Sequence, residues 1–248
     1  MKLQEEQEIL FQQIVDHRRA VRVFDQAIPF DQAVVRRGLE RAVLSPNSSN
    51  MQLWEFVHVQ SPAVLAALVP ICLGQQAART ARAMVAVVVR RDLWPRHCQQ
   101  VIDLQKAAFR AEGDGTLTDK HRRLLRYWEV GMPALHRSGG GVWDSLKRLG
   151  TWFKGWRQPV MRQVTSADMR LSAHRSAALA AQTFMLSVAA EGGDTCPMEG
   201  YDQRRAKALL GLPAKAELGM LIAVGKRAAN GIYGPRLRVP FEEVYSNL

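Results

Sequence analysis

The longest helical pattern of the chain, residues 167–191, most constrains how the chain can fold. Ala, Leu and Met occupy most of its faces, as in the stretch Ala177-Ala-Leu-Ala-Ala-Gln-Thr-Phe-Met-Leu-Ser-Val-Ala-Ala. A helix that is apolar nearly all round has to be buried on most sides, in the core or across a subunit interface. Gly192 and Gly193 are expected to end this helix, and His174 inside it is expected to be structural rather than catalytic.

The remaining periodicity outside the middle of the chain predicts a mixture of strands and helices. Residues 84–90 (Met-Val-Ala-Val-Val-Val-Arg) are apolar and β-branched, which is typical of a strand buried on both faces. The expected strands are 54–60, 84–90, 195–198 and 220–224, and the expected helices are 3–16, 31–43, a helix from about 62, and 74–82. A chain of 248 residues that is 47% hydrophobic can form one domain, residues 1–248, with a substantial core.

The amino-terminal sequence and the cysteine content indicate a cytoplasmic protein. No apolar run approaches the length of a membrane span, and the start (Met-Lys-Leu-Gln-Glu-Glu-Gln-Glu) is too acidic and polar for a signal peptide. Cys72, Cys98 and Cys196 are few, odd in number and lack the spacing of metal ligands. We therefore expect buried or free thiols in a reducing compartment, and no metal site.

Positive charge is concentrated in one part of the chain. The formal net charge is +11, and residues 120–175 hold 12 Lys and Arg against 3 Asp and Glu, or +9, which leaves 22 against 20, or +2, for the rest. Four of the six tryptophans, Trp128, Trp143, Trp152 and Trp156, lie in the same part. Helical patterns at 98–111, 119–130 and 142–156 are separated by a Gly-rich turn at 113–115 and a flexible joint at 138–141.

This basic, Trp-rich segment, the insert (residues 92–169), has two interpretations. In its last helical pattern Val142, Leu146, Leu149, Phe153 and Trp156 share one face, and the charged residues lie elsewhere on the helical wheel. A basic amphipathic helix with interfacial Trp can rest on an anionic membrane surface. The alternative, which we favour, is a lid that packs over an active site and leaves its charges in water.

The stretch 45–56, Ser-Pro-Asn-Ser-Ser-Asn-Met-Gln-Leu-Trp-Glu-Phe, is called here the Asn/Ser loop. Asn, Ser and Gln side chains offer donors and acceptors without charge, which suits the polar edge of a flat heterocycle. Pro, Asn and Ser are also the commonest turn formers, so when the stretch is taken alone an ordinary turn is the favoured interpretation.

Arginine-rich segments lie near both ends of the chain. The first is His17-Arg-Arg-Ala-Val-Arg22, and the second is Pro235-Arg-Leu-Arg-Val-Pro240, in which alternate arginines share one face of an extended chain. Guanidinium groups match phosphate geometry, and an anion would offset their mutual repulsion. Between them lies Pro197-Met-Glu-Gly-Tyr-Asp202, where a glycine permits close approach of the backbone to a ring.

These four motifs, in this order, resemble the nitroreductase family of FMN-dependent oxidoreductases. The resemblance covers roughly residues 9–90 and 170–248 and leaves the insert unmatched. It implies an α+β fold with a mainly antiparallel central sheet flanked by helices, assembled as a domain-interlocked homodimer with two FMN sites at the interface. Two positions depart from the family pattern: Ala20 replaces a small hydroxyl residue, and Leu53 replaces the proline before Trp54.

The resemblance also implies the site residues. The flavin phosphate and ribityl chain would lie at Arg18, Arg19, Ala20 and Arg22, with further phosphate contacts from Arg236 and Arg238. The ring would contact Pro46, Asn47, Ser48, Asn50 and Gln52, partly from the partner subunit, while Gln76 and Arg79 would face its pyrimidine edge. Pro197, Met198, Glu199 and Gly200 would lie at the reactive side of the ring, where the backbone N–H of Glu199 or Gly200 would serve catalysis at flavin N5.

The function implied is a ping-pong transfer of hydride from NADH or NADPH through FMN to an electron-poor acceptor such as a nitroaromatic or quinone. Related flavin reactions, namely reductive dehalogenation, ring reduction and oxidase chemistry, remain alternatives on the same fold. A further alternative is a peripheral membrane or nucleic-acid-binding protein that acts through the insert. Of these two partners, nucleic acid is the less favoured. The chain has no P-loop, GxGxxG fingerprint or Ser-His-Asp pairing, which fits an enzyme whose cofactor supplies the redox chemistry.

Overall fold

The centre of the fold is a four-stranded sheet with the strand order β1-β2-β4-β3. The strands are β1 (Trp54–Val59), β2 (Ala83–Val89), β3 (Asp194–Met198) and β4 (Glu217–Gly225), and every pairing between them is antiparallel. The architecture is therefore α+β with an antiparallel sheet, as the resemblance implied. The computed structural model describes residues 2–112, 115–137 and 141–248.

Strand β2 is buried at every position, and its side chains alternate between two separate cores. Val85, Val87 and Val89 belong to one core, and Met84 and Val88 belong to the other. This alternation follows from the period of two residues along a strand. The expectation of a strand buried on both faces is confirmed for residues 84–89, while Arg90 lies just after the strand and is only partly buried. Such burial requires helices on both sides of the sheet.

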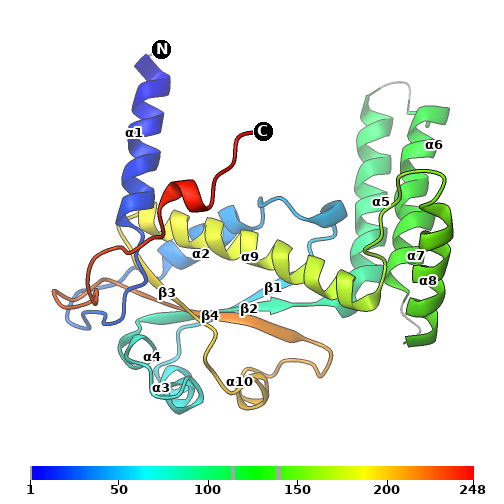
Figure 1. The fold of residues 1–248 in the computed structure, drawn as a ribbon. Helices are drawn as coiled ribbons and strands as arrows, with labels where there is room; N and C mark the ends of the chain where they lie inside the picture. Colours follow the sequence, from blue (N-terminus) through cyan, green and yellow to red (C-terminus); the bar gives the residue numbers. More distant parts are fainter. Residues whose placement is uncertain (1, 113–114, 138–140) are drawn as a thin grey trace.

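Helices cover both faces of the sheet (Figure 1). Helices α2 (Ala33–Ala42) and α9 (Ser166–Ala190) contribute to the first core, and α3 (Pro62–Ile71), α4 (Gln76–Thr80) and α10 (Gln203–Leu209) contribute to the second. Helix α9 begins with a capping box in which the Thr165 hydroxyl accepts a hydrogen bond from the backbone N–H of Asp168. It packs closely on α2, because a Cβ added at Gly38 would meet the ring of Phe184 at 3.0 Å.

Both ends of the chain extend from this layered body on the same side of the molecule (Figure 1). Helix α1 (Lys2–His17) leaves large apolar side chains in solvent, including Leu10 and Phe11. The carboxyl-terminal tail after β4 is mostly extended and ends with a 3₁₀ turn at Phe241–Glu243. Its residues Leu237, Phe241 and Tyr245 are also exposed. A single chain therefore leaves apolar surface uncovered at both termini.

The insert forms a group of helices at the opposite end of the sheet from α1 and the tail (Figure 1). It contains α5 (Trp94–Ala111), α6 (Asp119–Arg126), a π-helical turn (Tyr127–Gly131), α7 (Met132–His136) and α8 (Gly141–Lys154). The helix expected over 119–130 is thus α6 continued by a π turn, and α7 was not expected. Residues 113, 114 and 138–140, which belong to the predicted Gly-rich turn and joint, lie outside the described part of the chain.

Two expectations from the sequence concern the whole chain: the state of its cysteines and its ability to span a membrane. Cys72, Cys98 and Cys196 are buried free thiols, as the cysteine count indicated. None of the helices in the described ranges combines the length and the apolar composition needed to cross a bilayer.

A partly buried carboxylate joins the two ends of the insert to the sheet. Glu217, at the start of β4, accepts hydrogen bonds from Arg91 at 3.0 Å, from His174 at 3.1 Å and from Arg170. Burial alone would raise the pKa of Glu217, but the bonds from His174, Arg170 and Arg91 outweigh it and hold the pKa below its ordinary value of 4.5. His174 therefore has a structural partner.

We expect Glu217→Gln to lower the free energy of unfolding by about 1–3 kcal/mol at neutral pH, because it weakens three charge-assisted hydrogen bonds. A carboxyl whose pKa is depressed in the folded state stabilises the fold above its unfolded pKa, and this contribution is lost as the pH falls through the folded pKa. The difference in free energy of unfolding between wild type and Glu217→Gln should therefore become smaller once the pH falls below about 4.5. Urea unfolding at neutral and acidic pH measures it.

The matched control is Glu40→Gln, because Glu40 pairs with Arg36 on the surface, where the two side chains are 60% and 82% exposed. Such a pair contributes little, so this variant should match wild type at both pH values. A stability difference for Glu217→Gln that stays constant with pH would contradict the assignment.

Candidate functional site

The amino-terminal arginine segment crosses the edge of the sheet beside β3. Ala20 forms a parallel bridge with Thr195, and the backbone N–H of Val21 donates to the Thr195 carbonyl at 3.0 Å. The backbone N–H of Arg22 donates to the Gly231 carbonyl at 2.6 Å. These bonds, and the complete burial of Val21, fix the backbone from which the arginine side chains extend.

The carboxyl-terminal tail returns to the same place and is held there by arginine–carbonyl contacts. One guanidinium nitrogen of Arg236, Nη2, donates to the carbonyls of Val15 at 3.1 Å, Asp16 at 2.9 Å and Arg18 at 2.9 Å. Arg19 donates to the Gly234 carbonyl at 2.8 Å. A cation at the carboxyl end of α1 also interacts favourably with the helix dipole. Arg236 therefore attaches the tail to α1, a role that the sequence did not indicate.

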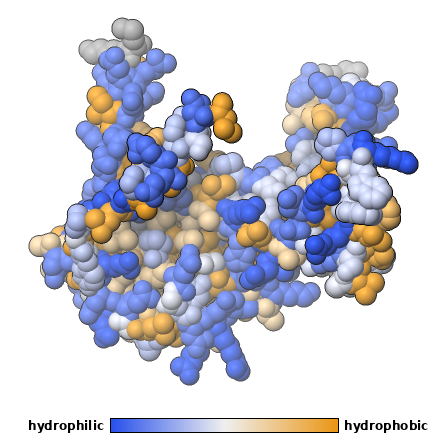
Figure 2. All heavy atoms as spheres, in the orientation of Figure 1, coloured by the Kyte–Doolittle hydropathy of each residue, from blue (hydrophilic) through white to orange (hydrophobic). Residues whose placement is uncertain are grey.

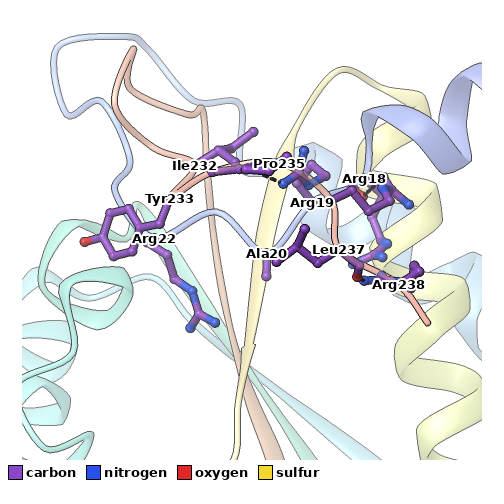
Figure 3. A pocket seen from close by; sticks show the side chains of 11 residues that line it. Arg18, Arg19, Ala20, Arg22, Ile232, Tyr233, Pro235, Leu237 and Arg238 are labelled. Atoms are coloured by element: carbon purple, nitrogen blue, oxygen red, sulfur yellow. Dashed lines mark hydrogen bonds between the residues drawn. The ribbon is translucent and has the colours of Figure 1, made fainter.

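A cavity of about 230 Å³ lies between these two segments, and the structure brings six of the predicted residues, five of them arginines, together around it. They are Arg18, Arg19, Arg22, Arg236 and Arg238, and Ala20 lies among them. Figure 3 shows Arg18 and Arg238 close together, with Arg22 apart from them. None of the described residues that line the cavity is acidic. We call it the arginine cavity.

The electrostatics of the arginine cavity favour an anion. The pKa of Arg18 is lowered from its ordinary value by burial and then by the positive charges of Arg236, Arg238 and Arg19. Each of these causes disfavours the charged guanidinium, and an anion in the cavity would reverse the effect of the like charges. Phosphate is the anion that several guanidinium groups bind best.

The turn at Glu199 and Gly200 follows the end of β3, the strand whose other end is bridged by Ala20. Glu199 and Gly200 are exposed, and the Gly200 carbonyl accepts a hydrogen bond from Gln75 Nε2 at 2.7 Å. On the other side, the hydroxyl of Tyr201 donates to the Leu218 carbonyl at 2.8 Å. Burial, and then the charges of Glu199 and Cys72, raise the pKa of Tyr201 to about 12, so this donor keeps its proton. The turn is therefore held on both sides, with Pro197 and Met198 in the strand that leads to it.

Gln75 was missed by the sequence analysis, which selected Gln76 and Arg79. The helix was expected to start at residue 74, but α4 starts at Gln76, and Gln75 lies before it with an extended backbone that lets its side chain reach Gly200. Gln76 and Arg79 are exposed on α4, and Arg79 donates weakly to the Gly74 carbonyl at 3.5 Å. One glutamine thus positions the turn, and its neighbour faces solvent.

The Asn/Ser loop has a strained backbone that is closed by its own side chains. Ser49, Asn50 and Gln52 have φ values of 54°, 52° and 48°, in the left-handed region that residues other than glycine rarely adopt. Asn47 Oδ1 accepts a hydrogen bond from the Gln52 backbone N–H at 2.8 Å. The backbone N–H of Ser48 donates to Ser176 of α9 at 3.2 Å. Ordinary turn chemistry alone would not require three such residues.

The insert supplies the other supports of the loop. Trp128 Nε1 donates to the Ser49 carbonyl at 3.1 Å, and the hydroxyls of Tyr127 and Ser49 share a hydrogen bond of 2.6 Å. His97 Nδ1 donates to the Met51 carbonyl at 3.0 Å. Tyr127 and Trp128 both lie on the π-helical turn, and such turns occur frequently at functional sites. None of the three insert residues was among the predicted site residues.

The predicted residues form two groups in one chain. The first comprises the arginine cavity, α4 and the Glu199–Gly200 turn, and the second is the Asn/Ser loop, which packs on α9 and the insert. Within the described ranges, no hydrogen bond or ion pair joins the two groups, and no loop residue lines the arginine cavity. One chain therefore presents two separate half-sites.

Comparisons with known proteins identify the family of this chain. The chain is 27% identical over 210 residues to Protein DrgA of Synechocystis, covering 85% of this chain and 80% of that protein. It is 26% identical over 229 residues to a NADH dehydrogenase of Thermus thermophilus, covering 92% and 90%. An Exiguobacterium sibiricum protein solved in complex with FMN has a TM-score of 0.67 at 23% identity, covering 96% of this chain and 97% of that one. The model of the Nitroreductase family matches residues 15–226, and the chain belongs to this family.

Proposed function

We propose that this protein transfers hydride from NADH or NADPH, with FMN as its cofactor, to a small electron-poor acceptor such as a nitroaromatic or a quinone. Its family makes it an FMN-dependent NAD(P)H oxidoreductase, and the acceptor class is our proposal. The observation that carries it is the arginine cavity, whose residue Ala20 bridges to Thr195 of β3, together with the exposed Glu199–Gly200 turn that follows the end of the same strand. The name of the Thermus thermophilus relative supports a nicotinamide electron donor.

The residues of the first half-site fit FMN. Arg18 and Arg238 would hold the phosphate, because they lie together in a cavity without an acidic lining residue among those described. Arg79, exposed on α4, would place a positive charge near the ring. Gln75 and Tyr201 keep the Glu199–Gly200 turn in one position, which leaves its backbone available to a flat ring. When bound, FMN supplies the hydride acceptor and donor of the reaction.

The second half-site supports a homodimer in which each cofactor site is completed by the partner's Asn/Ser loop. The loop carries uncharged donors and acceptors but lacks a phosphate site of its own among the described residues. The exposed apolar residues of α1 and the tail offer surface that a second copy would bury. In this arrangement the loop lies at the partner's cofactor. The insert is then a lid over that cofactor, because its residues His97, Tyr127 and Trp128 hold the loop.

We expect freshly purified protein, supplied with FMN if it is colourless, to show flavin absorption bands that bleach under anaerobic conditions with NADH or NADPH. Addition of a nitroaromatic or a quinone should then restore the bands. A correctly folded protein that binds no FMN would contradict the proposal. Bound flavin that neither nucleotide reduces would require a different electron donor, and bands that neither acceptor restores would exclude the proposed acceptor class.

Arg238→Ala should weaken FMN binding by about tenfold or more, because a hydrogen bond to a charged group contributes about 1.5–3 kcal/mol. Arg238 is the cleaner target because Arg236 also holds the tail on α1. Quenching of FMN fluorescence on titration with the protein measures the affinity. Arg205→Ala, which removes an arginine whose side chain is 78% exposed on α10, is the control and should bind FMN as wild type does. If Arg238→Ala bound FMN as tightly as Arg205→Ala, the assignment of Arg238 to the FMN phosphate would be refuted.

The shared site can be tested with two defective variants in one dimer. Arg18→Ala with Arg238→Ala damages the first half-site, and Ser48→Trp places a bulky ring on the exposed loop. Each variant alone should lose activity. Co-expression should restore about a quarter of the sites, because half of randomly formed dimers are mixed and one of their two sites is then intact. If both half-sites of one chain served the same cofactor, no activity would return.

A further inference from the structure

Helix α8 turns its apolar face away from the protein. Val142, Leu146, Leu149 and Phe153 lie on this helix as the sequence predicted, and their exposed fractions are 74%, 53%, 51% and 55%. Trp156, which was expected on the same helical face, lies in the turn just after α8 and is 69% exposed. Trp143 and Trp152 on the same helix are also exposed, and no residue of α8 is buried. A surface helix of a globular domain normally packs by its apolar side. Within the described residues, this chain therefore does not cover the apolar face of α8 itself.

The polar side of α8 makes the contacts that fix the helix on the protein. Asp144 accepts hydrogen bonds from the backbone N–H of Ser166 at 3.1 Å and from the Ser166 hydroxyl at 2.5 Å, at the start of α9. Lys147 Nζ donates to the carbonyls of Leu135 at 3.1 Å and Arg137 at 3.0 Å. These directed bonds hold the outward orientation of the apolar face, so that face is available to another partner.

The aromatic side chains at the carboxyl end of α8 form a compact apolar group. The ring centroids of Trp152 and Trp156 lie 4.3 Å apart, and those of Trp152 and Phe153 lie 4.9 Å apart. Figure 2 shows hydrophobic residues gathered on the outer part of the insert, beside hydrophilic ones. Contiguous exposed apolar surface of this kind marks a site of interaction. Trp is enriched where a protein meets the boundary between lipid and water.

The charge around this face determines what can cover it. Arg148, Lys154 and Arg157 are exposed on and just after α8, and Asp144, the only acidic residue of this helix, is bound to Ser166. Residues 120–175 carry +9 in total, from 12 basic and 3 acidic residues. A second copy packed on the same face would bring two such segments together, and this repulsion disfavours self-association. An anionic surface is complementary to both the charge and the aromatic face.

We propose that α8 docks this protein on an anionic lipid surface. The aromatic and aliphatic side chains enter the boundary between headgroups and acyl chains, and the exposed Arg and Lys side chains contact lipid phosphates. The contact is peripheral, because no helix in the described ranges could span a bilayer. The insert then has two sides: Tyr127, Trp128 and His97 face the Asn/Ser loop, and α8 faces the lipid.

The test is co-sedimentation of the FMN-supplied protein with vesicles of phosphatidylglycerol and phosphatidylcholine, compared with vesicles of phosphatidylcholine alone. We expect binding to the anionic vesicles that weakens as salt increases. Trp152→Ser, Phe153→Ser and Trp156→Ser combined should reduce the partition coefficient by about a hundredfold or more, because three buried aromatic side chains are lost. Arg148→Gln, Lys154→Gln and Arg157→Gln combined should reduce it by about tenfold or more.

The matched control for charge is Arg36→Gln, Arg204→Gln and Arg205→Gln combined, which removes the same charge from exposed positions outside the insert. Its partition coefficient for anionic vesicles should lie within about threefold of the wild-type value. The flavin absorption bands should be retained in every variant, because the substituted side chains are exposed and lie outside the cofactor residues. A control that loses as much binding as the α8 variant would overturn the proposal.

Three other results would also overturn it. The wild-type protein could remain in the supernatant with anionic vesicles, or it could bind single-stranded oligonucleotides and not vesicles. The aromatic variant could instead change the oligomeric state in sedimentation velocity and leave vesicle binding unchanged, which would show that a second copy covers α8. Binding lost on both types of α8 substitution, with the charge control unaffected, supports the lipid assignment.

Discussion

The burial of the central strand β2 on both faces is the constraint on which the rest of the structure depends. Because all its side chains are needed for the two cores, helices have to cover both sides of the sheet, and polar chemistry is excluded from its middle. The polar residues of the candidate site consequently lie at the margins of the sheet. Ala20 bridges to Thr195 at one margin, and the turn at Glu199 and Gly200 follows the end of β3.

At that margin, like charges are held together by backbone carbonyls. The bonds from Arg236 to Val15, Asp16 and Arg18 keep the tail beside α1, and Arg19 is bound to Gly234. These contacts offset part of the repulsion that lowers the pKa of Arg18. The arginine cavity is therefore assembled before a ligand binds, and a bound phosphate would replace repulsion with charge-assisted hydrogen bonds. Such preorganisation reduces the ordering cost of binding.

The insert contacts the Asn/Ser loop on its inner side and exposes α8 on its outer side. Its inner side stabilises a loop with three left-handed residues, a conformation that persists only where neighbouring groups hold it. Its entry and exit are joined by Glu217, which binds both Arg91 and Arg170. The outer helix α8 is fixed by Asp144 and Lys147. Polar contacts thus determine the orientation of an amphipathic helix whose apolar face is exposed.

Much of the fold could be predicted from the sequence alone. Periodicity located all four strands and α9, because alternation and helical spacing are local properties of the chain. The four motifs indicated the family, and the charge count located the basic segment. Contacts between distant residues could not be predicted in this way. Trp128 and Ser49 are 79 positions apart, and Gln75 and Gly200 are 125 apart. Periodicity shows which residues of α8 share a face, but it does not show where that face points. The direction of the face and the separation of the candidate site into two halves depend on long-range packing, which only the tertiary structure decided.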